Sequence, residues 1–247
     1  MESEVILEPK NHRIRYFHYC GDEEIIYLVN ENDTPYEGML RMEKNLELYR
    51  YDAWENKAYT ADVVTKNDST EIKISLKPSE SVIFVVGQRQ TEMFAKKEKC
   101  IQRVLLSPEK TLFKVSSCKS IDYPNFTNEE NVTKLVPYSY KYPKFSGYIA
   151  YETTIQLDDA KTMKNRNRLE LYIEDAGEDV EVFVNGKSAG MQVLSPFCFD
   201  ITNLWEQGEN LLRIEVATTL ERERGVNKKK QEDTGIFGNI ELLIYDE

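Results

Sequence analysis

The sequence has few histidines and lacks several of the short motifs that mark catalytic sites. His12 and His18 are the two histidines among 247 residues. No HExxH, GxGxxG or Walker pattern occurs, so zincin, dinucleotide-binding and P-loop chemistry have no motif to support them. Both histidines lie in or beside one expected strand, and we interpret them as strand residues rather than ligands or bases. We therefore expect no metal site and no cofactor.

Long apolar runs and cysteine pairs are also missing. No stretch approaches the roughly 18 consecutive apolar residues of a membrane span, so no membrane partner is expected. The start, MESEVILEPK, lacks the basic and apolar regions of a secretion signal. The four cysteines form no CxxC pair, and their spacings suit neither a zinc knuckle nor a disulfide framework. These features predict reduced thiols in a cytoplasmic protein.

The chain has fewer basic than acidic residues. There are 32 lysines and arginines against 43 acidic residues, which gives a net charge of −11. Such a chain repels phosphate backbones, so we expect no nucleic-acid partner. The one basic run, at residues 228–230, is followed by Glu232 and Asp233. We interpret it as a solvated loop.

Strand patterns dominate what is present. The 15 tyrosines, 10 phenylalanines and many β-branched residues favour strands, and long helical periodicity is scarce. Ile72, Ile74 and Leu76 alternate with polar residues, as in a half-buried antiparallel strand. Asn185 and Gly186 follow an alternating valine run and predict a type I′ hairpin turn. The fold class indicated is all-β, with antiparallel sandwiches.

The expected strands fall into two groups. The first group covers residues 13–20, 24–30, 36–42, 46–51, 58–65, 71–76 and 81–86. The second group lies between residues 148 and 246, after a polar and turn-rich segment, 116–142, expected to be a long loop with one strand at most. We predict a small β-sandwich over residues 1–89, a linker over 90–104 and a second antiparallel β domain over 105–247.

Acidic and aromatic clusters supply the binding candidates. The loop 174–179 carries four carboxylates, among them Glu174 and Asp175, which can face a sugar or a cation at a loop edge. The alternative is a solvated loop between two strands. Tyr51 and Trp54 lie in the aromatic segment LYRYDAWENKAY, and an exposed ring there can stack on a sugar. The alternative is a role in the core or at a strand end.

Four segments of the second half carry a resemblance to a known family. They read KFSGYIAYETTIQL, LELYIEDAGEDVEVFVNGKSAG, PFCFDITNLWEQGENLLRIEVATTLERERG and TGIFGNIELLIYD. In this order they resemble the sugar-binding jelly roll of family 2 glycoside hydrolases. This galactose-binding-like domain recurs in family 106 α-L-rhamnosidase-type proteins. The first half resembles, more loosely, the β-sandwich that precedes this jelly roll.

The resemblance implies an accessory region of a glycoside hydrolase. Such enzymes carry their catalytic carboxylates on a (β/α)₈ barrel of roughly 250 residues, and this chain shows no alternation of strands and helices. We expect no glycosidase turnover by this chain alone, and a barrel domain or a second copy of the chain as its partner. Three alternatives stay open: a saccharide-binding module, a purely structural or oligomerisation module, and a module that lends loop residues to a glycosidase active site.

The resemblance also implies where a sugar would bind, at the loops of one sandwich edge. A sugar needs directional hydrogen bonds and one apolar platform. For the arginines the alternative is ion pairing at the surface, and for the tryptophan it is a core position. The candidate residues are Glu174, Asp175, Arg222, Arg224 and Trp205, with Tyr51 and Trp54 as the next candidates; no residue is assigned as catalytic.

Overall fold

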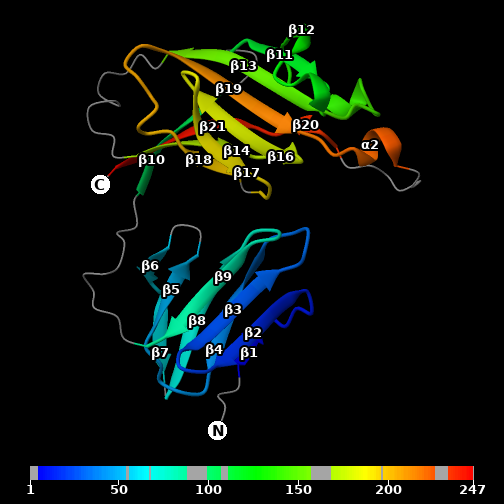
Figure 1. Cartoon of the computed structure of the whole chain (residues 1–247). Coiled ribbons are helices and arrows are strands. Elements are labelled where there is room, and N and C mark those ends of the chain that lie inside the picture. The colour runs from blue at the N-terminus through cyan, green and yellow to red at the C-terminus, as the bar shows by residue number, and fades with distance from the viewer. Residues whose placement is uncertain are drawn as a thin grey trace. The chain divides into compact units, whose positions relative to one another are not determined.

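A computed structural model describes residues 5–53, 56–66, 68–87, 99–106, 111–156, 168–195, 197–225 and 233–246. The chain divides into two compact units, Met1–Lys97 and Glu98–Glu247. Antiparallel strands form most of the described structure of both units, which confirms the expected all-β sandwich class (Figure 1). No helix in the described ranges has the length and apolar content needed to cross a bilayer.

The first unit is built from two antiparallel sheets around one core. Side chains from both sheets meet in a single hydrophobic cluster that includes Ile26, Leu28, Leu40 and Ile72. One sheet has the order β1 (Val5–Glu8), β4 (Tyr36–Met42), β8 (Ser69–Leu76) and β7 (Val63–Lys66). The other has the order β2 (Ile14–Cys20), β3 (Glu24–Asn30), β9 (Ser81–Val86), β5 (Leu48–Asp52) and β6 (Lys57–Thr60).

The expected strand at 58–65 is two strands in different sheets. β6 ends at Thr60 and β7 begins at Val63, and a backbone hydrogen bond from Val63 N to the Ala61 carbonyl, 3.0 Å, marks the bend between them. The sequence gives no glycine or proline at this point, so the corner was missed. The first strand, β1, was also not expected.

The second unit is a larger sandwich. Its two main sheets enclose a core that includes Leu171, Val182, Leu212 and Ile214. One sheet has the order β12 (Thr127–Val132), β11 (Phe113–Cys118), β13 (Tyr148–Gln156), β19 (Glu209–Ala217), β16 (Asp179–Val184) and β17 (Lys187–Gln192). The other has the order β10 (Lys99–Leu105), β21 (Ile240–Asp246), β14 (Arg168–Ile173) and β18 (Phe197–Asp200). β15 (Ala176–Gly177) pairs with β20 (Gly235–Ile236), and the short helical elements are η2 (Ser120–Asp122), η3 (Tyr138–Tyr140) and α2 (Glu221–Arg224).

The strand β10 lies where no strand was expected, and β12 lies in a segment where one strand at most was expected. Residues 99–104 of the expected linker form most of β10, which pairs with β21 and contains a bulge between Cys100 and Gln102. The bulge breaks the alternation that would have revealed this strand. Within 116–142, β12 pairs with β11 although most of its side chains are polar and exposed. An edge strand needs no apolar face when little of it is buried.

The hairpin predicted at Asn185 and Gly186 is confirmed, and it is tied to the next strand. Both residues have positive φ, 52° and 76°, and Val184 pairs with Lys187 across the turn. The Asn185 side-chain amide donates to the Asn210 side-chain oxygen at 2.9 Å, and the Asn185 side-chain oxygen accepts from Leu211 N at 3.0 Å. The turn therefore holds the start of β19 beside β16.

Asn210 is fully buried and its side chain organises the turn before β19. Its amide donates to the carbonyls of Glu206 and Gly208, at 2.9 and 3.1 Å. Its oxygen accepts from Glu206 N at 2.8 Å as well as from Asn185. Every hydrogen-bonding atom of this side chain therefore has a partner, as burial requires.

Asn210→Ala is expected to lower the free energy of unfolding by about 2–3 kcal/mol, because the groups that Asn210 satisfies lose their partners. Asn203→Ala is the matched control, since Asn203 lies in the same segment and is exposed. It should change stability by less than about 0.5 kcal/mol. Urea denaturation measures both variants, and equal midpoints for wild type and Asn210→Ala would contradict the role given to this side chain.

Candidate functional site

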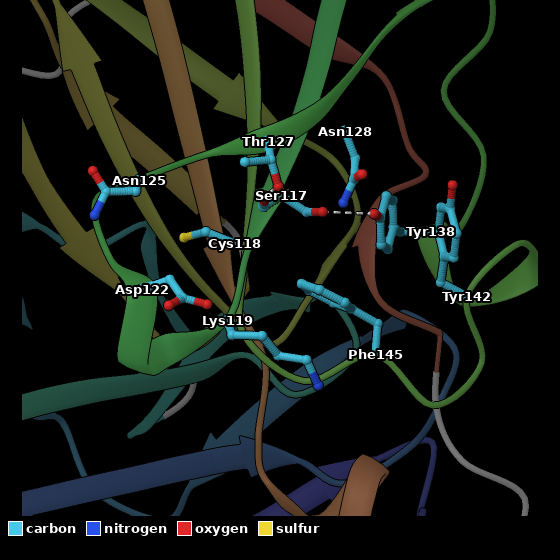
Figure 2. A pocket seen from close by; sticks show the side chains of 10 residues that line it. All are labelled: Ser117, Cys118, Lys119, Asp122, Asn125, Thr127, Asn128, Tyr138, Tyr142 and Phe145. Atoms are coloured by element: carbon cyan, nitrogen blue, oxygen red, sulfur yellow. Dashed lines mark hydrogen bonds between the residues drawn. The ribbon is translucent and has the colours of Figure 1, made fainter.

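A pocket of about 430 Å³ opens in the second unit, along the segment that connects β11 to β13. Its walls come from the end of β11, the turns around η2, the start of β12 and the region around η3 (Figure 2). These parts are close in sequence but form both sides of the cavity. The lining residues are Ser117, Cys118, Lys119, Asp122, Asn125, Thr127, Asn128, Tyr138, Tyr142 and Phe145.

One wall of the pocket is aromatic. The ring centroids of Tyr138 and Tyr142 are 4.8 Å apart, and Phe145 meets Tyr138 edge to face at 5.3 Å. The buried Tyr138 hydroxyl donates to Ser117 Oγ at 3.0 Å (Figure 2). Burial raises the pKa of Tyr138, so the phenol remains a neutral donor. Tyr142 is 38% exposed, so part of this aromatic wall is open to a ligand.

Four other lining residues are polar and exposed. Asp122, Asn125, Asn128 and Lys119 bring a carboxylate, two amides and an ammonium group to the lining. Two successive backbone bonds fix the turns that carry them. Asp122 N donates to the Lys119 carbonyl at 2.9 Å, and Asn125 N donates to the Asp122 carbonyl at 2.7 Å. The pocket lining thus combines hydrogen-bonding groups with aromatic rings.

Gly147 fixes how closely β13 approaches the pocket wall. Its φ is +149°, and a Cβ built there would lie 2.2 Å from the carbonyl oxygen of Cys118, a lining residue. No larger residue fits without moving one of these backbones. Gly147 N also donates to Thr218 Oγ1 at 2.9 Å. Gly147 therefore allows the end of β11 and the residue after β19, Thr218, to lie close together.

Lys119 connects the pocket to helix α2. Its Nζ lies 2.7 Å from Glu223 Oε2, with both side chains about half exposed. The hydrogen bond and charge of Lys119 lower the pKa of Glu223. The ion pair with Glu223 therefore positions Lys119, whose side chain lines the pocket.

Backbone N–H groups of residues 237–239 hold the acidic loop that was predicted as a sugar site. Glu174 Oε2 accepts from Asn239 N at 3.1 Å, and the Asp175 carbonyl accepts from Phe237 N and Gly238 N, each at 3.2 Å. Burial, followed by the nearby charge of Glu174, raises the pKa of Asp175. Both side chains are exposed at this loop.

Arg222 and Arg224 lie in different environments although they are two residues apart on α2. The Arg222 side chain is 5% exposed, and its Nε donates to Glu178 Oε1 at 3.2 Å. Glu178 also accepts from the Thr219 backbone. Arg224 is exposed. The two loops proposed from sequence therefore do meet, through Glu178 and Arg222. Arg222 is ion-paired, as the alternative expected, but the pair is largely buried and not at the surface.

The remaining candidates are scattered. Trp205 is 5% exposed and packs in the core of the second unit, which agrees with the core alternative left open for it. Tyr51 is half-buried in the first unit, and its hydroxyl donates to Asn56 Oδ1 at 2.7 Å. Trp54 lies outside the described residues. Binding of sugar by any of these residues stays a prediction.

The pocket itself was missed from the sequence. It lies in the segment interpreted as a loop, where tyrosines and amides recur without a strand period. The combination of amides at Asn125 and Asn128 with rings at Tyr138 and Tyr142 was available as a signal.

Comparisons with known proteins bear on the fold and on its context. No protein-family model matches the chain. A Formosa agariphila protein named "Putative beta-glucuronidase" is 39% identical over 72 residues, which are 29% of this chain and 6% of that protein. The rhamnosidase of Novosphingobium sp. PP1Y matches 98% of this chain and 25% of its own, with a TM-score of 0.69 at 17% identity.

The chain resembles part of a glycoside hydrolase. The predicted resemblance is thus confirmed, and for the rhamnosidase the shared feature is the fold. A beta-glucuronidase from an uncultured Clostridium sp. matches 62% of this chain and 30% of its own, with a TM-score of 0.47 at 16% identity. The chain spans a quarter of the rhamnosidase, and the matched segment is 6% of the Formosa protein.

Glu178→Ala is expected to destabilise the second unit by about 2–3 kcal/mol, because it leaves the Arg222 charge buried without this partner. The figure lies below that of a fully buried pair because Glu178 is 25% exposed. Glu209→Ala, at an exposed position of β19, serves as the control. Thermal and urea unfolding measure both variants, and equal stability of the two would show that the ion pair contributes nothing.

Asp175→Asn is expected to raise stability slightly at pH 7 and to lose this advantage in acid. The raised pKa of Asp175 means that folding disfavours its charged form, so the charge costs stability above the folded-state pKa. Below the unfolded-state pKa of about 3.9, Asp175 is protonated in both states and the cost is gone. Unfolding free energies from pH 3 to pH 7 measure this, and a difference independent of pH would contradict it.

Proposed function

We propose that this chain is a non-catalytic accessory region of a glycoside hydrolase that binds a saccharide in the pocket of its second unit. The observation that carries the proposal is one cavity lined both by aromatic rings, among them the partly exposed Tyr142, and by amide and carboxylate groups. A pyranose needs this combination, because its C–H face is apolar and its hydroxyls are directional. The likeness to the fold of a rhamnosidase supports the same context.

In this proposal the aromatic rings and the polar side chains have different roles. Tyr142 is the platform, and Tyr138 is the support that holds it, because Tyr138 is buried and bonded to Ser117. Asn125, Asn128 and Asp122 receive and donate hydrogen bonds to hydroxyl groups. The exposed amides and carboxylate lose water on binding, so the affinity for one sugar unit is expected in the millimolar range.

The second unit is proposed to be a galactose-binding-like jelly roll, and a catalytic barrel is proposed as its partner in a longer protein. The share of the rhamnosidase chain that is matched, 25%, leaves room for such a domain in that protein. Turnover by this chain alone is not expected. The loop residues Glu174, Asp175 and Arg224 remain a second proposed sugar contact in the same unit.

A bracing role is the second candidate function, and one observation favours it. Met191, Val193 and Leu194 are exposed apolar side chains at and just after β17, which is the edge strand of its sheet. Apolar side chains gathered at a sheet edge can pack against a barrel or a second copy of the chain. This role needs no sugar, so a binding experiment distinguishes the two candidates.

A glycan screen by NMR is expected to show resonance shifts for at least one monosaccharide, and Tyr142→Ala is expected to weaken that binding about tenfold, as loss of a stacked ring predicts. Tyr140→Ala is the matched control. Tyr140 is 71% exposed, lies two residues away and does not line the pocket.

The outcomes separate the candidates. Binding that falls in Tyr142→Ala and Asn125→Ala but not in Tyr140→Ala supports the pocket. Binding that falls only in Asp175→Ala or Arg224→Ala moves the site to the acidic loop. No shift with any sugar at high concentration removes the saccharide function and leaves the bracing role.

A further inference from the structure

The hairpin of β2 and β3 in the first unit gathers three different metal-ligating groups. His18 Nε2 lies 2.8 Å from Glu24 Oε1 and 3.5 Å from Cys20 Sγ. One donor atom from each residue lies within 4.8 Å of the other two. Neither the proposed saccharide function nor the rhamnosidase-like fold accounts for an imidazole, a thiol and a carboxylate at one point.

The strand register explains why these side chains converge. His18 and Cys20 are two residues apart on β2, so they share a face, and Glu24 pairs directly with Cys20 across the hairpin. His18 in turn pairs with Ile26, which is fully buried in the core. The three donors therefore continue the inner face of the sheet at its open end, where a polar group needs a partner.

Their burial differs in a way that suits a metal. The His18 side chain is 12% exposed and that of Glu24 is 32% exposed. Cys20 is exposed. The imidazole is thus held in place by the protein, while the thiol remains accessible from solvent. An entry path for an ion exists on the side of Cys20.

The spacing of the donors is close to that of a tetrahedral zinc site. Bond lengths of about 2.0–2.3 Å to nitrogen, oxygen and sulfur place neighbouring ligand atoms about 3.3–3.6 Å apart. The sulfur–nitrogen distance of 3.5 Å already matches, and the nitrogen–oxygen contact of 2.8 Å needs to open slightly. Calcium and magnesium prefer oxygen ligands, whereas a thiol with an imidazole selects zinc.

We propose that His18, Cys20 and Glu24 bind a zinc ion, with water or an external donor in the fourth position. In the metal-free protein His18 Nε2 lies within hydrogen-bond distance of both Glu24 Oε1 and Cys20 Sγ, so the imidazole already joins the other two groups. Zinc replaces these contacts with three coordinate bonds and fastens the edge strand β2 to β3. Because the unfolded chain lacks this arrangement, zinc stabilises the folded first unit.

Calorimetric titration of the metal-stripped full chain with zinc is expected to show one saturable site. Cys20→Ser and His18→Gln should each weaken that site at least roughly tenfold, the loss that even a change outside the ligand shell can cause. His12→Gln and Cys100→Ser are matched controls of the same residue types outside the cluster, and both should bind as wild type. Circular dichroism checks that each variant is folded.

Cobalt(II) supplies a second readout, because it takes the zinc geometry and shows a thiolate-to-metal charge-transfer band. This band should appear in wild type and be absent in Cys20→Ser, while Cys100→Ser keeps it. Absence of saturable zinc binding in wild type overturns the proposal. So does equal binding by wild type, Cys20→Ser and His18→Gln, which would show that zinc is held elsewhere. Neither result bears on saccharide binding, since that pocket lies in the other unit.

Discussion

The hydrogen bond between the side chains of Asn185 and Asn210 is the constraint on which the second unit depends. It joins the hairpin after β16 to the turn before β19, and β19 in turn pairs with both β13 and β16. An amide pair of this kind is directional, so it fixes register in a way that interchangeable valines and leucines do not. The same two asparagines stand in the segments that carry the family resemblance, which therefore reflects turn chemistry rather than a ligand.

The pocket lies in a part of the chain that contributes few residues to the core. The strands of the central sheet point their alternating apolar residues into the interior. The connection from β11 to β13 is mostly polar and lies at the edge of the sheet. Tyr138 of this connection enters the core, and Tyr142 packs against it while staying partly exposed. The exposed groups proposed for binding lie in the turns of this connection, as is common where loops carry function.

The sequence predicted the fold class and the inner strands well because burial imposes a period on them. Val180, Val182 and Val184 show this alternation, and all three are fully buried. The edge strand β10 was not predicted, and β12 was not located within the segment 116–142, because exposure removes that period. The pocket escaped for a related reason, since a cavity is defined by turns around residues 119–128 and by the approach at Gly147, which no local pattern encodes.

Helix α2 lies between the two proposed sugar contacts and holds each with a different kind of ion pair. Glu223 reaches Lys119 in the pocket through an exposed pair, and Arg222 reaches Glu178 in the acidic loop through a largely buried one. Dissolved salt screens the first pair far more than the second. Rising ionic strength therefore weakens the link between α2 and Lys119 more than the link between α2 and the acidic loop, so the two contacts differ in their salt dependence although they share one helix.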